Sequence, residues 1–282
     1  MAPSQAYKAY RIPQPGELAA LSPSLVVTPH YPPNQDTITA VLILFHGLGD
    51  SDSSFASFAR GMNLPGVLAL TVRGTSPLPP GLFTTASSSS QHFHWGDDLH
   101  ISPRTGDLDP DPGFAKAADL VLHRLVADLL VGQCSWSAAD ILLFGYGQGG
   151  SLALGLASQV RMPPRVQDIT AGEEPSSSSS SSSGTLGTAF RGVVSIGGPL
   201  PQSMVPTVST RSKSETPVLL CHGSRSEAVD EDAVDEIKAE FAKVTVTKWS
   251  KPQDSMPSNR EEMLPIMQFF AERLRDGWAP GQ

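Results

Sequence analysis

One glycine-rich turn has the form of a catalytic motif. The run "LLFGYGQGGSLAL" (142–154) places one apolar segment before the glycines and another after them, which is typical of a buried strand that turns sharply into a helix. In the motif G-x-S-x-G, the central residue of such a turn is a serine whose hydroxyl projects above the sheet as a nucleophile. This chain has Gly147 at that point, so the sequence predicts the turn without its nucleophile.

A second cluster could bind a metal. The segment "QHFHWGDDLH" (91–100) brings together imidazole and carboxylate side chains, namely His92, His94, Asp97, Asp98 and His100. The pattern H-x-H on a strand would place two rings on one face, so a metal site is one interpretation. An exposed loop of polar groups around a buried Trp95 is the simpler one. We therefore expect no metal.

Four further side chains have structural interpretations. His46 and His222 each precede a glycine at the end of an apolar run, and we expect both to be hydrogen-bonded structural histidines. Cys221 adjoins His222 on the same strand, where neighbouring side chains point to opposite faces, so the two do not form a catalytic dyad. Ser151 lies in the first turn of the helix after the glycines and is expected to pack rather than react.

The elements that position these residues alternate between strands and helices. Strands separated by helices predict parallel pairing with right-handed crossovers, and hence a three-layer α/β fold with a central, mostly parallel sheet. The expected strands are 38–47, 66–73, a strand leading to the glycine turn, 190–198, 216–223 and 243–249. The expected helices are a short one at 55–62, then 114–130, about 148–160, about 230–243 and a last helix from a capping box at 258–261 to about 275.

The chain is predicted to form one domain. Residues 1–36 form a Pro-rich lead-in, residues 37–275 form the domain, and residues 276–282 form a tail. A segment at about 161–187 contains eight consecutive serines and is too polar to bury, so we expect a disordered surface insertion there.

Three segments carry a resemblance to a known family. The runs "LILFHGLGDSDSSF", "GYGQGGSLAL" and "PVLLCHG", in this order and spacing, resemble the acyl-protein thioesterase group of the phospholipase/carboxylesterase family, over roughly Thr37 to Arg275. The resemblance implies an α/β-hydrolase fold. It also implies descent from enzymes that hydrolyse esters and thioesters with serine, aspartate and histidine, in this chain order.

Carried over residue by residue, the resemblance predicts a degenerate triad. Gly147 stands where the family has its serine, Ser226 where it has its aspartate, and Met256 where it has its histidine. The backbone N–H groups of Leu48 and Gln148 correspond to the oxyanion hole, which binds the negatively charged oxygen of the reaction intermediate. No catalytic residue is therefore expected, although the oxyanion hole remains.

The conclusion that the base is missing does not depend on this alignment. All seven histidines lie at or before residue 222, namely His30, His46, His92, His94, His100, His123 and His222. The family's base follows the last strands, and no imidazole occurs there to accept a proton near neutral pH. Asp230 could replace the acid and Asp254 could lie near the histidine position, but a carboxylate beside Gly147 has no hydroxyl to activate.

These observations predict a catalytically degenerate hydrolase that binds an acyl or ester small molecule or a protein partner, without a cofactor. A weak or non-standard ester or thioester hydrolase is the alternative, with serine-directed labelling and metal dependence as discriminating tests. The net charge of −8, without a basic cluster, argues against nucleic acid. No signal-peptide core or run of about 18 apolar residues occurs, so we expect a cytoplasmic protein, present also in the nucleus, with no transmembrane segment.

Overall fold

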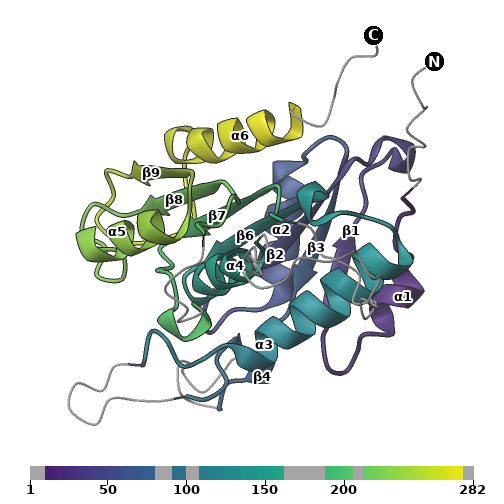
Figure 1. Cartoon of the computed structure of the whole chain (residues 1–282), viewed down its shortest axis with the longest axis horizontal. Helices are drawn as coiled ribbons and strands as arrows, with labels where there is room; N and C mark the ends of the chain where they lie inside the picture. The colour runs from purple at the N-terminus through teal and green to yellow at the C-terminus, as the bar shows by residue number, and fades with distance from the viewer. Residues whose placement is uncertain (1–9, 80–90, 100–107, 162–187, 206–211, 276–282) are drawn as a thin grey trace, which may run out of the picture.

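The structure is a computed structural model that describes residues 10–79, 91–99, 108–161, 188–205 and 212–275. A seven-stranded sheet forms its centre (Figure 1). β1 pairs antiparallel with β3, and all other neighbours in the sheet are parallel. The strand order is β1 (Val27–His30), β3 (Val67–Val72), β2 (Ala40–Phe45), β6 (Ile141–Tyr146), β7 (Gly192–Ile196), β8 (Val218–His222) and β9 (Val244–Lys248).

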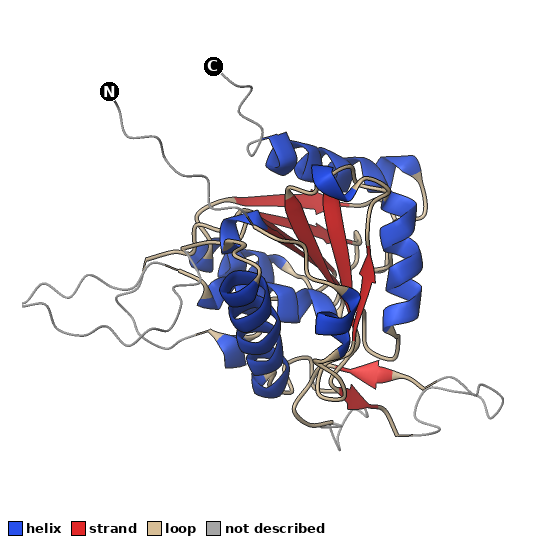
Figure 2. Cartoon of the chain, turned by 90° about the vertical axis from the view of Figure 1, so that its right-hand side faces the viewer, coloured by secondary structure: helices blue, strands red, loops and turns tan. Residues whose placement is uncertain are grey.

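Helices cover both faces of this sheet (Figure 2), which confirms the predicted three-layer α/β fold. On one face lie α2 (Asp52–Met62) and α6 (Arg260–Arg275). The other face carries α1 (Pro15–Ala19), α3 (Ala115–Asp119) with its wider continuation Leu120–Gln133, α4 (Gln148–Gln159) and α5 (Glu231–Glu240). None of the helices in the described residues has the length and hydropathy needed to cross a bilayer.

The central strands are buried on both faces because each face packs against helices. Every residue of β2 is buried, and its side chains alternate between the two cores. Val41, Ile43 and Phe45 pack in the core beneath α3 and α4. Ala40, Leu42 and Leu44 pack in the core beneath α2 and α6. A near-continuous apolar run is therefore the correct signature for this strand, as the sequence predicted.

Several short elements were not predicted. α1 and β1 lie within the Pro-rich segment 1–36, and β1 extends the sheet by one antiparallel strand. A two-stranded ribbon, β4 (Ser76–Pro77) and β5 (Phe93–His94), lies between the expected strand 66–73 and the expected helix 114–130, where no strand was predicted. Single-turn helices occur at Gln35–Thr37, Ala138–Asp140 and Gln202–Met204. The predicted Ser-rich insertion falls almost entirely within 162–187, and these residues lie outside the described part, as does the tail 276–282.

Candidate functional site

Gly147 forms the sharp turn between β6 and α4. Its backbone has φ 52° and ψ −122°, a conformation that favours glycine. Two hydrogen bonds hold it: its N–H donates to the carbonyl of Ile196 at 2.8 Å, and its carbonyl accepts from the N–H of Ser151 at 3.0 Å. An ideal Cβ built on Gly147 has no heavy atom within 4 Å. The turn thus has room for a Cβ but carries none.

Two other glycines allow α4 to approach the sheet. A Cβ on Gly145 would lie only 2.1 Å from the carbonyl oxygen of Gly149, and one on Gly149 would lie 2.4 Å from the carbonyl oxygen of His46. Because these contacts are with backbone atoms, side chains at either position would force the helix away from β2 and β6. The glycine-rich sequence therefore serves the tight strand-to-helix packing, independently of any reaction.

The two predicted oxyanion-hole residues lie at the carboxyl ends of neighbouring strands. Leu48 follows β2, Gln148 begins α4 directly after β6, and these strands are paired in parallel so that Phe45 lies opposite Gly145. The first N–H groups of a helix have no partner within the helix, which suits the backbone of Gln148 for binding a negatively charged oxygen. The side chain of Gln148 is engaged elsewhere, because its Oε1 accepts from the N–H of Trp95 at 2.8 Å.

His46 has a structural role beside this turn. The ring is fully buried, Nδ1 donates to the carbonyl of Gly47 at 2.7 Å, and Nε2 accepts from the N–H of Gly74 at 2.8 Å. The indole of Trp95 donates to the His46 carbonyl at 2.8 Å. Burial lowers the pKa of His46, so the neutral tautomer is favoured. Both ring nitrogens are occupied, and neither is available to accept a proton from a substrate.

Ser226 and Asp254 form a hydrogen-bonded pair at the ends of β8 and β9. The hydroxyl of Ser226 donates to Oδ2 of Asp254 at 2.6 Å and accepts from the N–H of Val229 at 2.9 Å. The other carboxylate oxygen, Oδ1, accepts from the N–H of Gly223 at 2.8 Å. A hydroxyl on the loop after β8 and a carboxylate on the loop after β9 are thus joined directly.

The Ser226–Asp254 pair lies close to the two glycines after β7, Gly197 and Gly198, and Gly198 in turn lies against Gly147. A Cβ on Gly197 would lie 2.5 Å from Cβ of Asp254, and a Cβ on the next residue, Gly198, would lie 2.5 Å from the carbonyl oxygen of Gly147. Asp254 and Gly147 are therefore separated by the two glycines that follow β7. The sequence analysis placed Asp254 near the position where the family has its histidine. It did not predict the hydrogen bond between Asp254 and Ser226.

Met256 is oriented differently from Asp254. Its side chain is half-buried against the core beneath α2 and α6, and its carbonyl accepts from Nζ of Lys251 at 3.0 Å. Lys251 also donates to the carbonyl of Ser255 at 2.9 Å and to Oε2 of Glu262 at 3.0 Å. Lys251 therefore ties the loop that carries Asp254 and Met256 to the first turn of α6. Of the two, Asp254 is the residue that contacts Ser226.

Asp230 and Ser151 take part in local structure. The carboxylate of Asp230 accepts from the N–H of Ala233 at 2.8 Å and so caps α5, which is a common use of aspartate. Ser151 is buried in the first turn of α4, where its N–H bonds to Gly147. The thiols of Cys134 and Cys221 are free and buried, and burial raises the pKa of Cys221 to about 12. This argues against a thiolate nucleophile.

The polar cluster at 91–100 does not converge on a common point in the described residues. Nδ1 of His92 lies 2.6 Å from the carbonyl oxygen of Gly49, while the carboxylate of Asp97 accepts from the N–H groups of Ala115 and Lys116 and caps α3. His94 is buried, and burial lowers its pKa. His100 lies outside the described residues. Within the described ranges, no group of three His, Cys, Asp or Glu side chains could hold a metal.

A mostly parallel sheet covered on both faces, with a glycine turn between β6 and α4, defines the α/β-hydrolase class of fold. Residues 31–172 match the family described as Phospholipase/Carboxylesterase, and the chain belongs to this family.

Known relatives support the same assignment. An uncharacterized hydrolase of Schizosaccharomyces pombe is 26% identical over 241 residues, which cover 85% of this chain and 86% of that protein. An uncharacterized hydrolase of Mycosarcoma maydis is 33% identical over 130 residues, or 44% of each chain.

Solved structures show a similar fold. Acyl-protein thioesterase 2 of Zea mays has a TM-score of 0.55 at 20% identity and covers 88% of this chain and 98% of its own. The carboxylesterase of Bacillus cereus has a TM-score of 0.57 at 14% identity and covers 89% of this chain and 95% of its own.

Proposed function

We propose that this chain is a catalytically degenerate member of its family, a pseudo-hydrolase that binds a ligand or a protein partner. The observation that carries the proposal is Gly147, which occupies the nucleophile position of the turn without a side chain. The acyl or ester compounds that active relatives hydrolyse are the proposed small-molecule ligands. No cofactor is required for such binding.

The other two triad positions support the proposal. The chain has no histidine after His222, so an imidazole base from the loops beyond β8 is missing. In its place, the carboxylate of Asp254 accepts a hydrogen bond from Ser226. With a triad removed, an oxyanion hole and binding alone leave roughly 10³–10⁴-fold acceleration over water, far below a working hydrolase.

The structure suggests how to restore a triad. Because the hydroxyl of Ser226 lies 2.6 Å from Oδ2 of Asp254, an aspartate at 226 and a histidine at 254 would have their side chains directed toward each other. The first variant combines Gly147→Ser, Ser226→Asp and Asp254→His. The second variant combines Gly147→Ser and Ser226→Asp with Met256→His and keeps Asp254, as the sequence alignment suggests.

Hydrolysis of a medium-chain thioester and of a matching ester by the purified parent and both variants tests the proposal. We expect a silent parent and activity in the variant with Asp254→His, because Asp254 is the residue that contacts position 226. A parent that turns over at about 1 s⁻¹ or faster, within the range of ordinary enzymes, would show that the pseudo-hydrolase proposal is wrong.

One observation favours a second candidate function, a weak serine hydrolase. The hydroxyl of Ser226 donates a hydrogen bond to the carboxylate of Asp254. Ser226 could therefore act as a nucleophile and Asp254 as its base, without a histidine. Labelling by a fluorophosphonate that Ser226→Ala abolishes would support this function. No labelling of the parent, together with labelling of the restored variant, would support the pseudo-hydrolase.

The proposed compartment is the cytoplasm, with the nucleus as a second location. Both cysteines are unpaired, which fits a reducing environment. Imaging of a fluorescently tagged full-length chain tests the location.

A further inference from the structure

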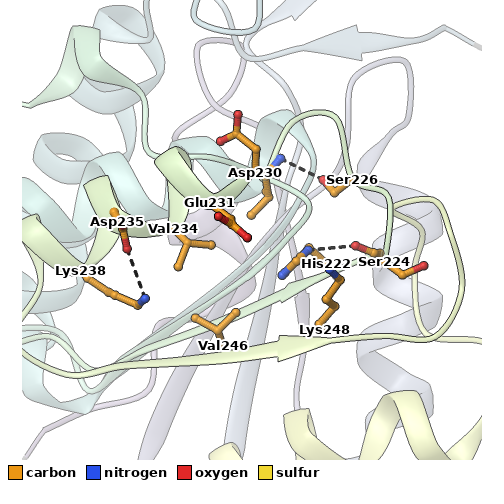
Figure 3. A pocket seen from close by; sticks show the side chains of 12 residues that line it. His222, Ser224, Ser226, Asp230, Glu231, Val234, Asp235, Lys238, Val246 and Lys248 are labelled. Carbon is orange, nitrogen blue, oxygen red and sulfur yellow. Dashed lines mark hydrogen bonds and ion pairs between the residues drawn. The ribbon is translucent and has the colours of Figure 1, made fainter.

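A cavity of about 530 Å³ lies between α5 and the edge strand β9, near the carboxyl end of β8 (Figure 3). This volume is within the range of about 300–1,000 Å³ that is usual for small-molecule sites. Ser226 lines the cavity, but its hydroxyl is engaged by Asp254 and by the N–H of Val229. The cavity is therefore a site beside the Ser226–Asp254 pair, outside the Gly147 turn.

The middle of the cavity is apolar. Val234 of α5 and Val246 of β9 face each other across it (Figure 3), and Val229 adds a buried aliphatic side chain from the loop before α5. Val246 is 36% exposed, which is high for a strand residue that faces a helix. The exposure arises because α5 and β9 leave this space unfilled. An aliphatic ligand would bury this surface.

Charged groups of both signs surround the apolar centre. At one end, Asp235 and Lys238 form an ion pair at 3.3 Å and so neutralise each other. Glu231 and Lys248 also line the cavity, and neither forms an ion pair within the described part of the chain. An unpaired carboxylate and an unpaired ammonium group are therefore available to a ligand.

His222 adds a hydrogen-bond acceptor. Its Nδ1 lies 2.9 Å from the carbonyl oxygen of Gly223 and must be the donor in that contact. In the neutral ring Nε2 is then the acceptor. The imidazole lines the cavity and is only 8% exposed, and Figure 3 shows it near Lys248. A ligand whose carboxylate reaches Lys248 can donate an adjacent N–H to this nitrogen, as the amide of a dipeptide does.

We propose that this cavity binds a small zwitterion with an aliphatic body, namely a free amino acid or a dipeptide. Its ammonium group pairs with Glu231, its carboxylate pairs with Lys248, and its aliphatic side chain packs on Val234 and Val246. A simple anion would meet the carboxylate of Glu231, and a divalent cation would meet the ammonium group of Lys248. A molecule that carries both charges around an apolar body satisfies both.

Isothermal titration calorimetry of the full chain with L-leucine and with L-leucyl-L-leucine tests this proposal. We expect saturable binding of at least one probe, and the comparison of the two distinguishes an amino-acid site from a dipeptide site. N-acetyl-leucine amide, which lacks both charges, should not bind. Glu231→Gln and Lys248→Met should each weaken binding about tenfold, the effect of losing about 1.4 kcal/mol.

Matched controls exist on the same elements. Asp232→Asn changes the neighbouring acidic residue of α5, and Lys243→Met changes a lysine directly before β9; neither residue lines the cavity, and neither change should alter affinity. Val234→Phe fills the apolar centre and should abolish binding, with folding checked by circular dichroism. The proposal is overturned if neither probe binds, if the blocked compound binds equally well, or if both charge variants retain parental affinity. These results are independent of whether the chain hydrolyses esters.

Discussion

Gly147 combines a backbone that only glycine adopts easily with open space around the position that a Cβ would occupy. A residue with a Cβ at φ 52° and ψ −122° pays backbone strain on the order of 1–3 kcal/mol. No steric clash adds to this, because an ideal Cβ contacts nothing within 4 Å. A catalytic serine at this position would carry that strain, and the glycine removes it. Loss of the nucleophile thus favours stability.

A pair of alanine substitutions separates strain from crowding. Gly147→Ala should lower the free energy of unfolding by about 1–3 kcal/mol. Gly61→Ala is the control, because Gly61 lies in α2 with equally open space and an ordinary helical backbone, and alanine there should stabilise by about 0.5–1 kcal/mol. Urea unfolding measures both. A stabilising Gly147→Ala would contradict the strain argument.

At the residue scale, the sequence predicted the missing side chains better than the contacts that replace them. Gly147 and the absence of late histidines can be read directly from the sequence. The hydrogen bond between Ser226 and Asp254 joins positions 28 residues apart on two loops, and its geometry depends on how both loops leave the sheet. No local pattern encodes that contact.

At the scale of elements, a partly buried ion pair ties the loop between β9 and α6 to the first turn of α6. Nζ of Lys251 lies 3.0 Å from Oε2 of Glu262, which also accepts from the N–H and hydroxyl of Ser258. The Ser258 N–H bond, followed by Lys251, lowers the pKa of Glu262. This loop carries Asp254, so the ion pair also fixes the position of the carboxylate that meets Ser226.

Glu262→Gln should therefore destabilise the protein at neutral pH by about 1–3 kcal/mol, because it leaves Lys251 without its charged partner. The folded-state pKa of Glu262 is below its unfolded value, so its contribution is present above about pH 4.3 and is lost as the pH falls further. The difference in unfolding free energy between parent and variant should thus shrink in acid. Glu261→Gln, an exposed neighbour, should have little effect, and an equal loss in both variants would contradict the prediction.

The elements that the sequence missed share a physical reason. β1 contains Pro29, and proline within a short run argues against a strand unless the strand is at an edge, as β1 is. β4 and β5 have two residues each and depend on tertiary contacts, such as the bond from the N–H of Phe93 to Asp50. The long apolar strands β2 and β6 were predicted correctly because burial on both faces leaves an unambiguous pattern.

At the scale of the whole molecule, two buried histidines make global stability depend on pH. His46 and His94 have relative exposures of 0% and 4%, and burial lowers the pKa of each. Below about pH 6.5 these rings bind protons more fully in the unfolded chain than in the folded chain. The unfolded state then binds more protons, so stability falls as the pH falls toward the folded-state pKa values.

Unfolding free energies measured by urea between pH 6.5 and 5 should fall, at a limiting slope of about 1.4 kcal/mol per pH unit for each histidine. His46→Gln should reduce the slope, whatever its effect on stability at neutral pH. His123→Gln provides the control, because the side chain of His123 is 67% exposed. A slope unchanged by His46→Gln would show that this ring is not protonated on unfolding.

The open space above Gly147 also makes the turn suitable for selective chemical labelling. The chain has two cysteines, both buried, and burial raises the pKa of both thiols. Gly147→Cys would introduce a thiol directly before α4. This thiol would therefore be more reactive in the folded protein than those of the two native cysteines. A fluorophore attached there would report whatever comes to rest over the turn, whether an acyl chain or a protein surface.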